Sequence, residues 1–223
     1  MNKCVLVVAA HADDETLGCG GTIARHVAEG DIVHAIFMAD GVTSRTNTIP
    51  GDLERRMASA RQAHKILGLQ RVKYLEMPDN SMDSLPMLQI VKAVESAIQS
   101  ISPSVIYTHH HGDLNIDHRL THQAVMTACR PQPESAVKEI LCFEVLSSTD
   151  WATPNQMPFI PNVFVDISEF LATKLDALQA YQSEIRNAPH SRSIAHAEVL
   201  ARHRGHTVGL AAAEAFVSVR HIR

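Results

Sequence analysis

The chain has 223 residues, 45% of them hydrophobic, and a formal net charge of −4 at pH 7. This length suits one full-sized α/β domain, so we expect residues 1–223 to form a single domain. The slightly acidic balance gives no reason to expect nucleic acid or an anionic membrane surface as a partner. The sequence has no run of about 18 apolar residues and no N-terminal pattern of a secretory signal. We therefore expect a cytoplasmic protein that acts on a small molecule and does not bind membranes.

Strands and helices are predicted to alternate along most of the chain. Apolar, β-branched runs predict strands, and longer amphipathic runs predict helices. The alternation is typical of a Rossmann-like α/β fold, in which a mostly parallel central sheet carries helices on both faces. In chain order, the predicted strands are 4–10, 32–39, 72–75, 104–108, 140–146 and 162–166, and the predicted helices are 17–29, 52–67, 85–100, 117–129, 168–183, 194–203 and 211–219.

The four cysteines, Cys4, Cys19, Cys129 and Cys142, form no C-x-x-C pair, and three of them lie in apolar surroundings. They are predicted to be small buried residues in a reducing compartment rather than disulfide partners or zinc ligands. Nothing in the sequence sets the oligomeric state, and a homo-oligomer is compatible with it.

The first predicted strand ends in a cluster of polar residues. His11, Asp13 and Asp14 follow the apolar run, at the sheet edge where open α/β proteins bind ligands. His11 and Asp14 can direct a nitrogen and an oxygen at a common point, whereas Asp13 between them faces another way. We therefore predict that one Asp binds a metal while the other faces a metal-bound water. In the competing interpretation, Asp14 or Thr16 caps the following helix.

The run Gly18-Cys19-Gly20-Gly21 has some similarity to a dinucleotide-binding fingerprint. The fingerprint G-x-G-x-x-G would require glycine at position 23, where the sequence has Ile23. The acids before these glycines would also repel a pyrophosphate. We therefore attribute the glycines to close packing of helix on strand and expect no nicotinamide cofactor.

Five of the 14 histidines lie between positions 109 and 122. His118 falls in the first turn of a predicted helix, and His122 lies one turn later on the same face. Both could be metal ligands, but we favour His118 as ligand and His122 as a structural residue, because a catalytic site needs an open position for water. His11, Asp14 and His118 then form a His₂–carboxylate set, the ligand type of hydrolytic zinc sites. Fe²⁺ and Co²⁺ accept the same ligands.

This set predicts metal-assisted amide hydrolysis. Zinc would lower the pKa of a bound water to about 7 and polarise a substrate carbonyl. Asp13 could accept the proton of that water and pass it to the departing nitrogen. Phosphoryl transfer is less favoured, because two-metal phosphatases need more bridging carboxylates than the sequence offers.

Two motifs resemble those of a known family. His11-Ala12-Asp13-Asp14-Glu15 closely resembles the H-P-D-D-E motif of the PIG-L/LmbE-like N-deacetylases, and the run from 113 to 119 resembles their second metal motif. The similarity extends over nearly the whole chain, with Arg56, Asp79 and the segment 213–216 in family-like places. It implies a Rossmann-like fold and zinc-dependent removal of an acyl group, usually acetyl, from an amino sugar.

The resemblance also implies roles for individual residues. The three ligands named above would hold the metal, with one zinc per chain, and Asp13 would be the general base. Arg56 becomes a candidate for holding a charged part of the substrate, and Asp79 a candidate for binding a sugar hydroxyl.

Two positions depart from the family pattern. Ala12 replaces the usual proline, which loosens the loop but removes no chemical group. Asn115 stands where many members have a histidine that is proposed to stabilise the oxyanion or act as an acid. An amide can donate a hydrogen bond to an oxyanion but cannot supply a proton at neutral pH. Either Asp13 makes both proton transfers, or another histidine, His110 or His190, enters the site.

The leading hypothesis is a zinc-dependent enzyme that removes the N-acetyl group from an N-acetylamino sugar, with sugar nucleotides and sugar conjugates among its candidate substrates. Four arginines lie in predicted loops or helices from which they could reach a phosphate: Arg45, Arg56, Arg192 and Arg204. Of these, Arg45 and Arg56 are predicted substrate-binding residues, together with Asp79 and His190. One alternative is an amidohydrolase that acts on a non-sugar N-acyl compound. Another is a metal-bound module without catalysis, which Asp13 disfavours because structural zinc sites are closed by four protein ligands.

Overall fold

The computed structural model describes residues 2–154 and 157–223, in which seven strands form one sheet in the order β3-β2-β1-β4-β5-β7-β6. The neighbouring pairs among β1 to β5 are all parallel, whereas β7 is antiparallel to both β5 and β6. The predicted mostly parallel sheet is therefore confirmed. The strands are β1 (Cys4–Ala9), β2 (Ile32–Ala39), β3 (Arg71–Met77), β4 (Val105–His109), β5 (Glu139–Phe143), β6 (Val163–Asp166) and β7 (Ala213–His221).

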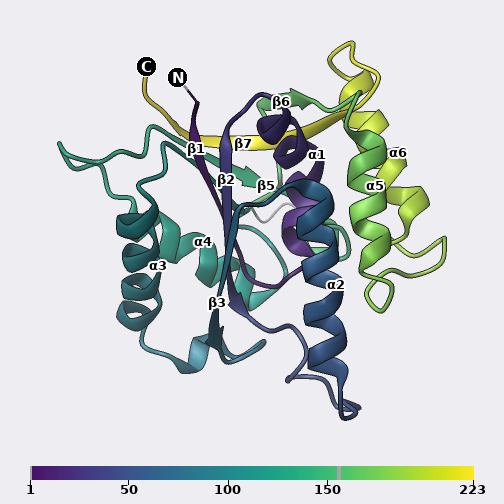
Figure 1. The fold of residues 1–223 in the computed structure, drawn as a ribbon, viewed down its shortest axis with the longest axis horizontal. Coiled ribbons are helices and arrows are strands. Elements are labelled where there is room, and N and C mark those ends of the chain that lie inside the picture. The colour runs from purple at the N-terminus through teal and green to yellow at the C-terminus, as the bar shows by residue number, and fades with distance from the viewer. Residues whose placement is uncertain (1, 155–156) are drawn as a thin grey trace.

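Helices cover both faces of the sheet (Figure 1). Alternate residues of β1 point to opposite faces: Val7 packs with α1, α2 and α5, and Leu6 packs with α3 and α4. The sixth helix, α6, packs against α5 and β7. No helix within the described ranges is long and apolar enough to cross a membrane. The helices are α1 (Asp14–Ala28), α2 (Asp52–Leu67), α3 (Met87–Ile101), α4 (Ile116–Ala128), α5 (Leu171–Ala180) and α6 (Ile194–His206).

The last predicted helix is wrong. Residues 211–219 are rich in alanine, which favours a helix, but β7 occupies most of this segment. The strand lies between β5 and β6 and pairs with both. Its first four residues are buried, so pairing on two edges and burial on both faces outweigh local propensity.

The cysteines are free, as predicted, with three buried and Cys4 half-buried. Two of the α1 glycines allow the close packing that the sequence predicts. A Cβ on Gly18 would lie 2.3 Å from Cδ2 of Phe143, and a Cβ on Gly21 would lie 2.8 Å from Cδ1 of Ile167. A Cβ on Gly20 would meet no atom closer than 3.4 Å.

The Gly18→Ala substitution is expected to lower the free energy of unfolding by about 1–3 kcal/mol, because the added methyl group overpacks against a fully buried ring. Gly20→Ala is the matched control. It is expected to be neutral or to stabilise by up to about 1 kcal/mol, since alanine favours a helix. Urea unfolding followed by circular dichroism measures both changes. Equal stabilities of the two variants would contradict the packing role of Gly18.

A buried ion pair stabilises a break within α1. Cys19 has non-helical φ and ψ angles of −147° and 24°, which interrupts the helical hydrogen bonds. The carboxylate of Glu214 accepts hydrogen bonds from the N–H groups of Gly21 (3.0 Å) and Thr22 (2.7 Å). Lys174 donates to Glu214 (2.5 Å) and to a carbonyl on the other side of the break (2.8 Å). The backbone groups at the break are therefore paired, and α1 is fixed to α5 and β7.

Candidate active site

A polar cavity of about 190 Å³ lies at the carboxyl edge of the parallel strands. The loops that follow β1 to β5 supply its walls, together with α2, α4 and the connection between α5 and α6. β1 lies between β2 and β4 in the sheet. From β1 the chain first adds β2 and β3 on one side and then crosses to the other side to add β4 and β5. Open α/β sheets bind ligands at such a switch point.

Three side chains in this cavity form a candidate metal centre. Ligand atoms of His11, Asp14 and His118 all lie within 4.8 Å of one another. Asp14 Oδ2 is 3.4 Å from Nδ1 of His11 and 3.3 Å from Nε2 of His118. Two imidazoles and one carboxylate in this arrangement could hold a divalent metal and leave a coordination position open.

In each of the two imidazoles, the nitrogen that does not face Asp14 contacts another carboxylate. Nε2 of His11 lies 3.2 Å from an oxygen of Asp79 and 3.2 Å from an oxygen of Asp117. Nδ1 of His118 lies 3.1 Å from Asp113. Carboxylates in this position fix the ring and the tautomer of a metal-binding histidine.

The charges around the imidazoles fit a cation. Burial by itself lowers an imidazole pKa, but the charges of Asp14 and Asp113 raise the pKa of His118 to about 9. Hydrogen bonds to neighbouring carboxylates likewise outweigh burial and raise the pKa of His11 well above its usual value. A metal binding here would displace these protons. Four carboxylates that contact the two rings are buried: Asp14, Asp79, Asp113 and Asp117.

His109 and His122 lie next to the candidate metal centre and are not among its three candidate ligands. Nε2 of His109 accepts a hydrogen bond from the backbone N–H of Ala10 (2.8 Å), so this nitrogen is not free for a metal. The His109 ring stacks on His118 with 3.9 Å between centroids. His122 donates from Nδ1 to the carbonyl of His109 (2.9 Å). His109 is therefore placed to orient the His118 ring, and His122 fixes the backbone of His109.

The backbone at Asp13 is strained and held by its neighbours. Asp13 has a φ of 138°, and its N–H donates to Glu15 Oε2 (2.9 Å). The Asp13 carbonyl accepts a helical hydrogen bond from the N–H of Leu17 (2.9 Å). The Asp13 side chain does not cap the helix. The competing interpretation of a capped helix is wrong, because α1 begins at Asp14 and the Asp14 carboxylate accepts the N–H of His11 instead (2.9 Å).

The Asp13 side chain lines the same cavity as the candidate ligands and contacts two arginines. Oδ1 accepts a hydrogen bond from Nη2 of Arg56, and Oδ2 accepts one from Nη1 of Arg192, each at 3.0 Å. Burial raises the pKa of Asp13 to about 6, although the two guanidinium groups oppose this shift. The two guanidinium contacts favour the ionised carboxylate, and each oxygen keeps a lone pair for a proton.

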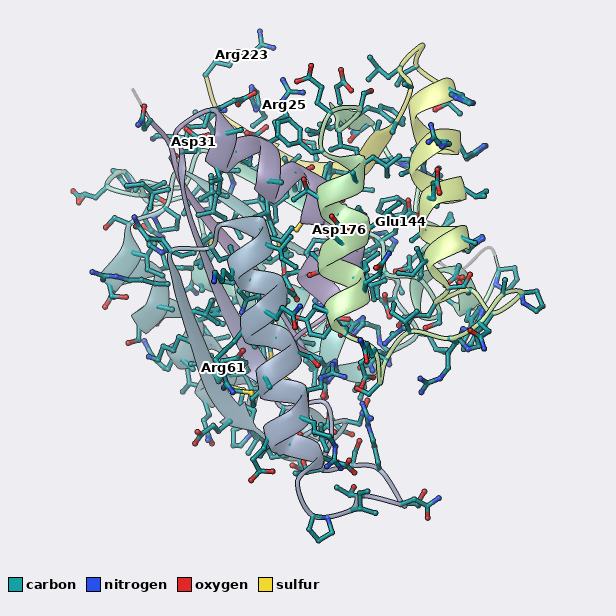
Figure 2. All side chains as sticks on the ribbon, turned by 45° about the vertical axis from the view of Figure 1, so that its right-hand side comes forward. Arg25, Asp31, Arg61, Glu144, Asp176 and Arg223 are labelled. Atoms are coloured by element: carbon teal, nitrogen blue, oxygen red, sulfur yellow. The ribbon has the colours of Figure 1, made fainter. Side chains whose placement is uncertain are left out.

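The predicted substrate-binding arginines line the cavity. Arg45 donates to the carbonyl of Gly41 (2.7 Å) and to Glu184 (2.9 Å). Arg56 is buried and pairs with Glu184 at 2.7 Å. By contrast, Arg204 lies outside the cavity wall and pairs with Glu144, which Figure 2 shows between α5 and α6.

Asp79 and His190 lie near the cavity but do not form its wall. One Asp79 oxygen faces His11, and the other accepts hydrogen bonds from the N–H (3.0 Å) and hydroxyl (2.7 Å) of Ser44. This placement suits orientation of His11 better than binding of a sugar hydroxyl. The Nδ1 atom of His190 accepts the backbone N–H of Arg192 (3.0 Å), and its ring packs against Trp151.

Asn115 lines the cavity, whereas His110 does not. Oδ1 of Asn115 caps α4 by accepting the N–H of Asp117 (2.8 Å), and Nδ2 donates to Asn80 (2.9 Å). Nε2 of His110 donates to the carbonyl of Met157 (2.9 Å), because successive side chains after β4 point in different directions. The structure therefore brings neither His110 nor His190 into the cavity to replace the histidine that the family pattern has at position 115.

Sequence reasoning missed several residues that contact the predicted ones. Asp113 and Asp117 lie within the second motif, so their short distance in sequence from His118 could have indicated a supporting role. Glu184 and the contact of Arg192 with Asp13 left no such signal, because both come from the connection between α5 and α6.

The fold and the cavity together define an α/β protein with a buried His₂–carboxylate centre, a ligand set found in metal-dependent hydrolases. The chain matches the family model PIG-L, described as GlcNAc-PI de-N-acetylase, over residues 6–129. It is 32% identical over 187 residues to the uncharacterized deacetylase YaiS of Escherichia coli (strain K12), with 81% of this chain and 91% of that protein covered. The chain therefore belongs to the PIG-L family.

Two further comparisons agree with this assignment. The chain is 27% identical over 195 residues to a probable N-acetyl-alpha-D-glucosaminyl L-malate deacetylase 2 of Bacillus cereus, with 82% of this chain and 84% of the relative covered. The solved structure of N,N'-diacetylchitobiose deacetylase from Pyrococcus horikoshii aligns with a TM-score of 0.80 at 19% identity, with 97% and 83% of the two chains covered. The second likeness shows a shared fold.

Proposed function

We propose that this chain is a zinc-dependent N-deacetylase that hydrolyses the acetamide group of an N-acetylamino sugar. The convergence of three ligand atoms beside the buried carboxylate of Asp13 carries the proposal. Relatives that are named as deacetylases of glucosaminyl compounds support the amino-sugar class. His11, Asp14 and His118 would hold the metal.

Asp13 would act as the general base and then as the acid. A bound zinc ion supplies Lewis-acid activation of water and of the amide carbonyl. Asp13 takes a proton from the attacking water and delivers it to the sugar nitrogen as the C–N bond breaks, which gives acetate and a free amine. Asn115 cannot supply this proton, since an amide does not ionise at neutral pH. Its Nδ2 group can at most donate a hydrogen bond.

Arg45 is the arginine best placed to contact an anionic part of the substrate. Its side chain is 39% exposed, whereas the Arg56 side chain is 4% exposed and pairs with both Asp13 and Glu184. Arg56 thus serves the protein's own carboxylates, and Arg45 can turn toward a phosphate or carboxylate in the cavity.

Acetate release from a substrate panel tests the proposal. The panel contains N-acetylglucosamine, its 1-phosphate, its uridine diphosphate conjugate, diacetylchitobiose and several N-acetyl amino acids. Protein stripped by a chelator and reloaded with Zn²⁺, Fe²⁺ or Co²⁺ is assayed beside untreated protein. We expect release from at least one sugar, loss on chelation and recovery with zinc. Release from the N-acetyl amino acids alone would identify the non-sugar amidohydrolase instead, and no release by fully metal-loaded protein would overturn the proposed activity.

A further inference from the structure

The connection between α5 and α6 reaches Asp13 indirectly by two routes. The hydroxyl of Tyr181 donates to Oε1 of Glu15 (2.8 Å). Oε2 of Glu15 accepts a hydrogen bond from the backbone N–H of Asp13 (2.9 Å), the residue with the strained backbone. Glu184 pairs with Arg56, which donates to Oδ1 of Asp13. Both Tyr181 and Glu184 are buried, so these contacts form part of the packed interior.

Arg192 makes the third and direct contact from the same connection. Its Nη1 donates to Oδ2 of Asp13 (3.0 Å), and its Nε donates to Oγ of Ser147 (2.9 Å). His190 accepts its backbone N–H (3.0 Å). The side chain is 19% exposed, and two of its three guanidinium nitrogens are used inside the protein. The guanidinium plane is therefore set before a substrate arrives.

We propose that Arg192 is a positioning residue that fixes the carboxylate plane of Asp13 for proton transfer, an inference that rests on the proposed deacetylase function. The terminal torsion of an aspartate is broad, so one contact from Arg56 leaves the plane free to rotate. A second donor on the other oxygen removes this freedom. Correct placement of a reacting group matters because a 1 Å error can cost about 10²-fold in rate.

Arg192 also adds to the positive charge around Asp13. Glu184 pairs with both Arg45 and Arg56, so Asp13 shares Arg56 with a second buried carboxylate. A buried carboxylate without adequate compensation is costly. Arg192 places a further positive charge directly on the Asp13 oxygen that Arg56 does not contact.

Arg192→Met, Arg192→Lys and the control Arg186→Met test this role by steady-state kinetics on the best sugar of the panel. Arg192→Met is expected to lower kcat about 10- to 100-fold with KM within about threefold, since the base is misplaced but substrate contacts remain. The kcat of Arg192→Lys is expected to lie between those of the wild type and Arg192→Met, because an ammonium group restores the charge but not the rigid planar donors of a guanidinium. Arg186 lies in the same connection, is exposed and donates only to backbone carbonyls, so its variant should match the wild type.

Other kinetic outcomes would overturn the inference. An increase of KM at unchanged kcat in Arg192→Met would make Arg192 a substrate-binding residue. Unchanged kcat and KM in this variant would show that Arg192 does not position Asp13. Loss of zinc from Arg192→Met, measured by plasma mass spectrometry, would show that the residue supports the ligands rather than Asp13.

A double-mutant cycle tests the contact independently of activity. The free energy of unfolding in urea is measured for Arg192→Met, Asp13→Asn and the double variant. The effects of the two substitutions are expected to be non-additive, since Asp13→Asn removes the charge of the contact and Arg192→Met removes its donor. Additive effects would overturn the inference even if the wild type releases no acetate. An inactive wild type with clear coupling would overturn only the proposed deacetylase function.

Discussion

The Asp13→Asn substitution is expected to lower the kcat of deacetylation about 10²- to 10⁴-fold, the contribution of a well-placed general base. An amide has nearly the shape of a carboxylate, so the loop between β1 and α1 should keep its conformation. The candidate ligands do not depend on the Asp13 side chain, which faces Arg56 and Arg192. Zinc content is therefore expected to stay at one ion per chain. Acetate release and plasma mass spectrometry measure the two quantities on the same sample.

Asp176→Asn is the matched control for this experiment. Asp176 lies on the exposed surface of α5 (Figure 2), and the same change of charge there is expected to leave kcat unaltered. Full activity of Asp13→Asn would contradict the assignment of Asp13 as the base. Loss of zinc together with activity would show instead that Asp13 supports the ligands through its two arginines.

The residues of the candidate metal centre could be predicted from sequence because local geometry brings most of them together. His11 and Asp14 lie three residues apart, between the end of a strand whose apolar pattern is unambiguous and the first residue of α1. His118 lies in the first turn of a helix that follows another parallel strand. The carboxyl ends of parallel strands meet at one sheet edge, so the strand pattern alone places both segments there.

The contacts around Asp13 could not be predicted in the same way. Arg192 lies 179 residues from Asp13 in sequence, and Glu184 meets Arg56 only after α5 has packed beside α2. The predicted role of Asp79 rests on its family-like position, whereas its contacts with Ser44 and His11 join loops that are far apart in sequence. The strand β7 was missed for a related reason: alanine favours a helix locally, and only the two neighbouring strands make this segment extended.

The directions of the histidine side chains after β4 could not be predicted from the sequence. His110 and His190 are the sequence candidates for replacing the histidine that the family pattern has at position 115. The backbone after β4 directs His109 beneath His118 and His110 toward the carbonyl of Met157. Burial lowers the pKa of His109 well below its usual value, which agrees with a neutral ring that accepts a hydrogen bond from the backbone. These histidines therefore shape the site without entering it.

The second large effect is expected from His118→Ala, which should abolish zinc binding. The substitution removes one of three ligands and leaves Asp14 and Asp113 without the imidazole that lies between them. Zinc content after loading and dialysis should fall from one ion per chain to a trace. Added zinc should no longer raise the melting temperature, whereas a ligand at 100 times its Kd stabilises the wild-type fold by about 2.7 kcal/mol.

His122→Ala distinguishes loss of a ligand from loss of a helical histidine. His122 lies one turn further along α4 and donates to the carbonyl of His109, so its removal costs a hydrogen bond of about 1 kcal/mol but no ligand. This variant should bind zinc with wild-type stoichiometry and show the same rise in melting temperature on zinc addition. Stoichiometric zinc in His118→Ala would refute the ligand assignment. Loss of zinc in both variants would mean that the His109–His122 contact holds the centre together, because His109 is the ring on which His118 stacks.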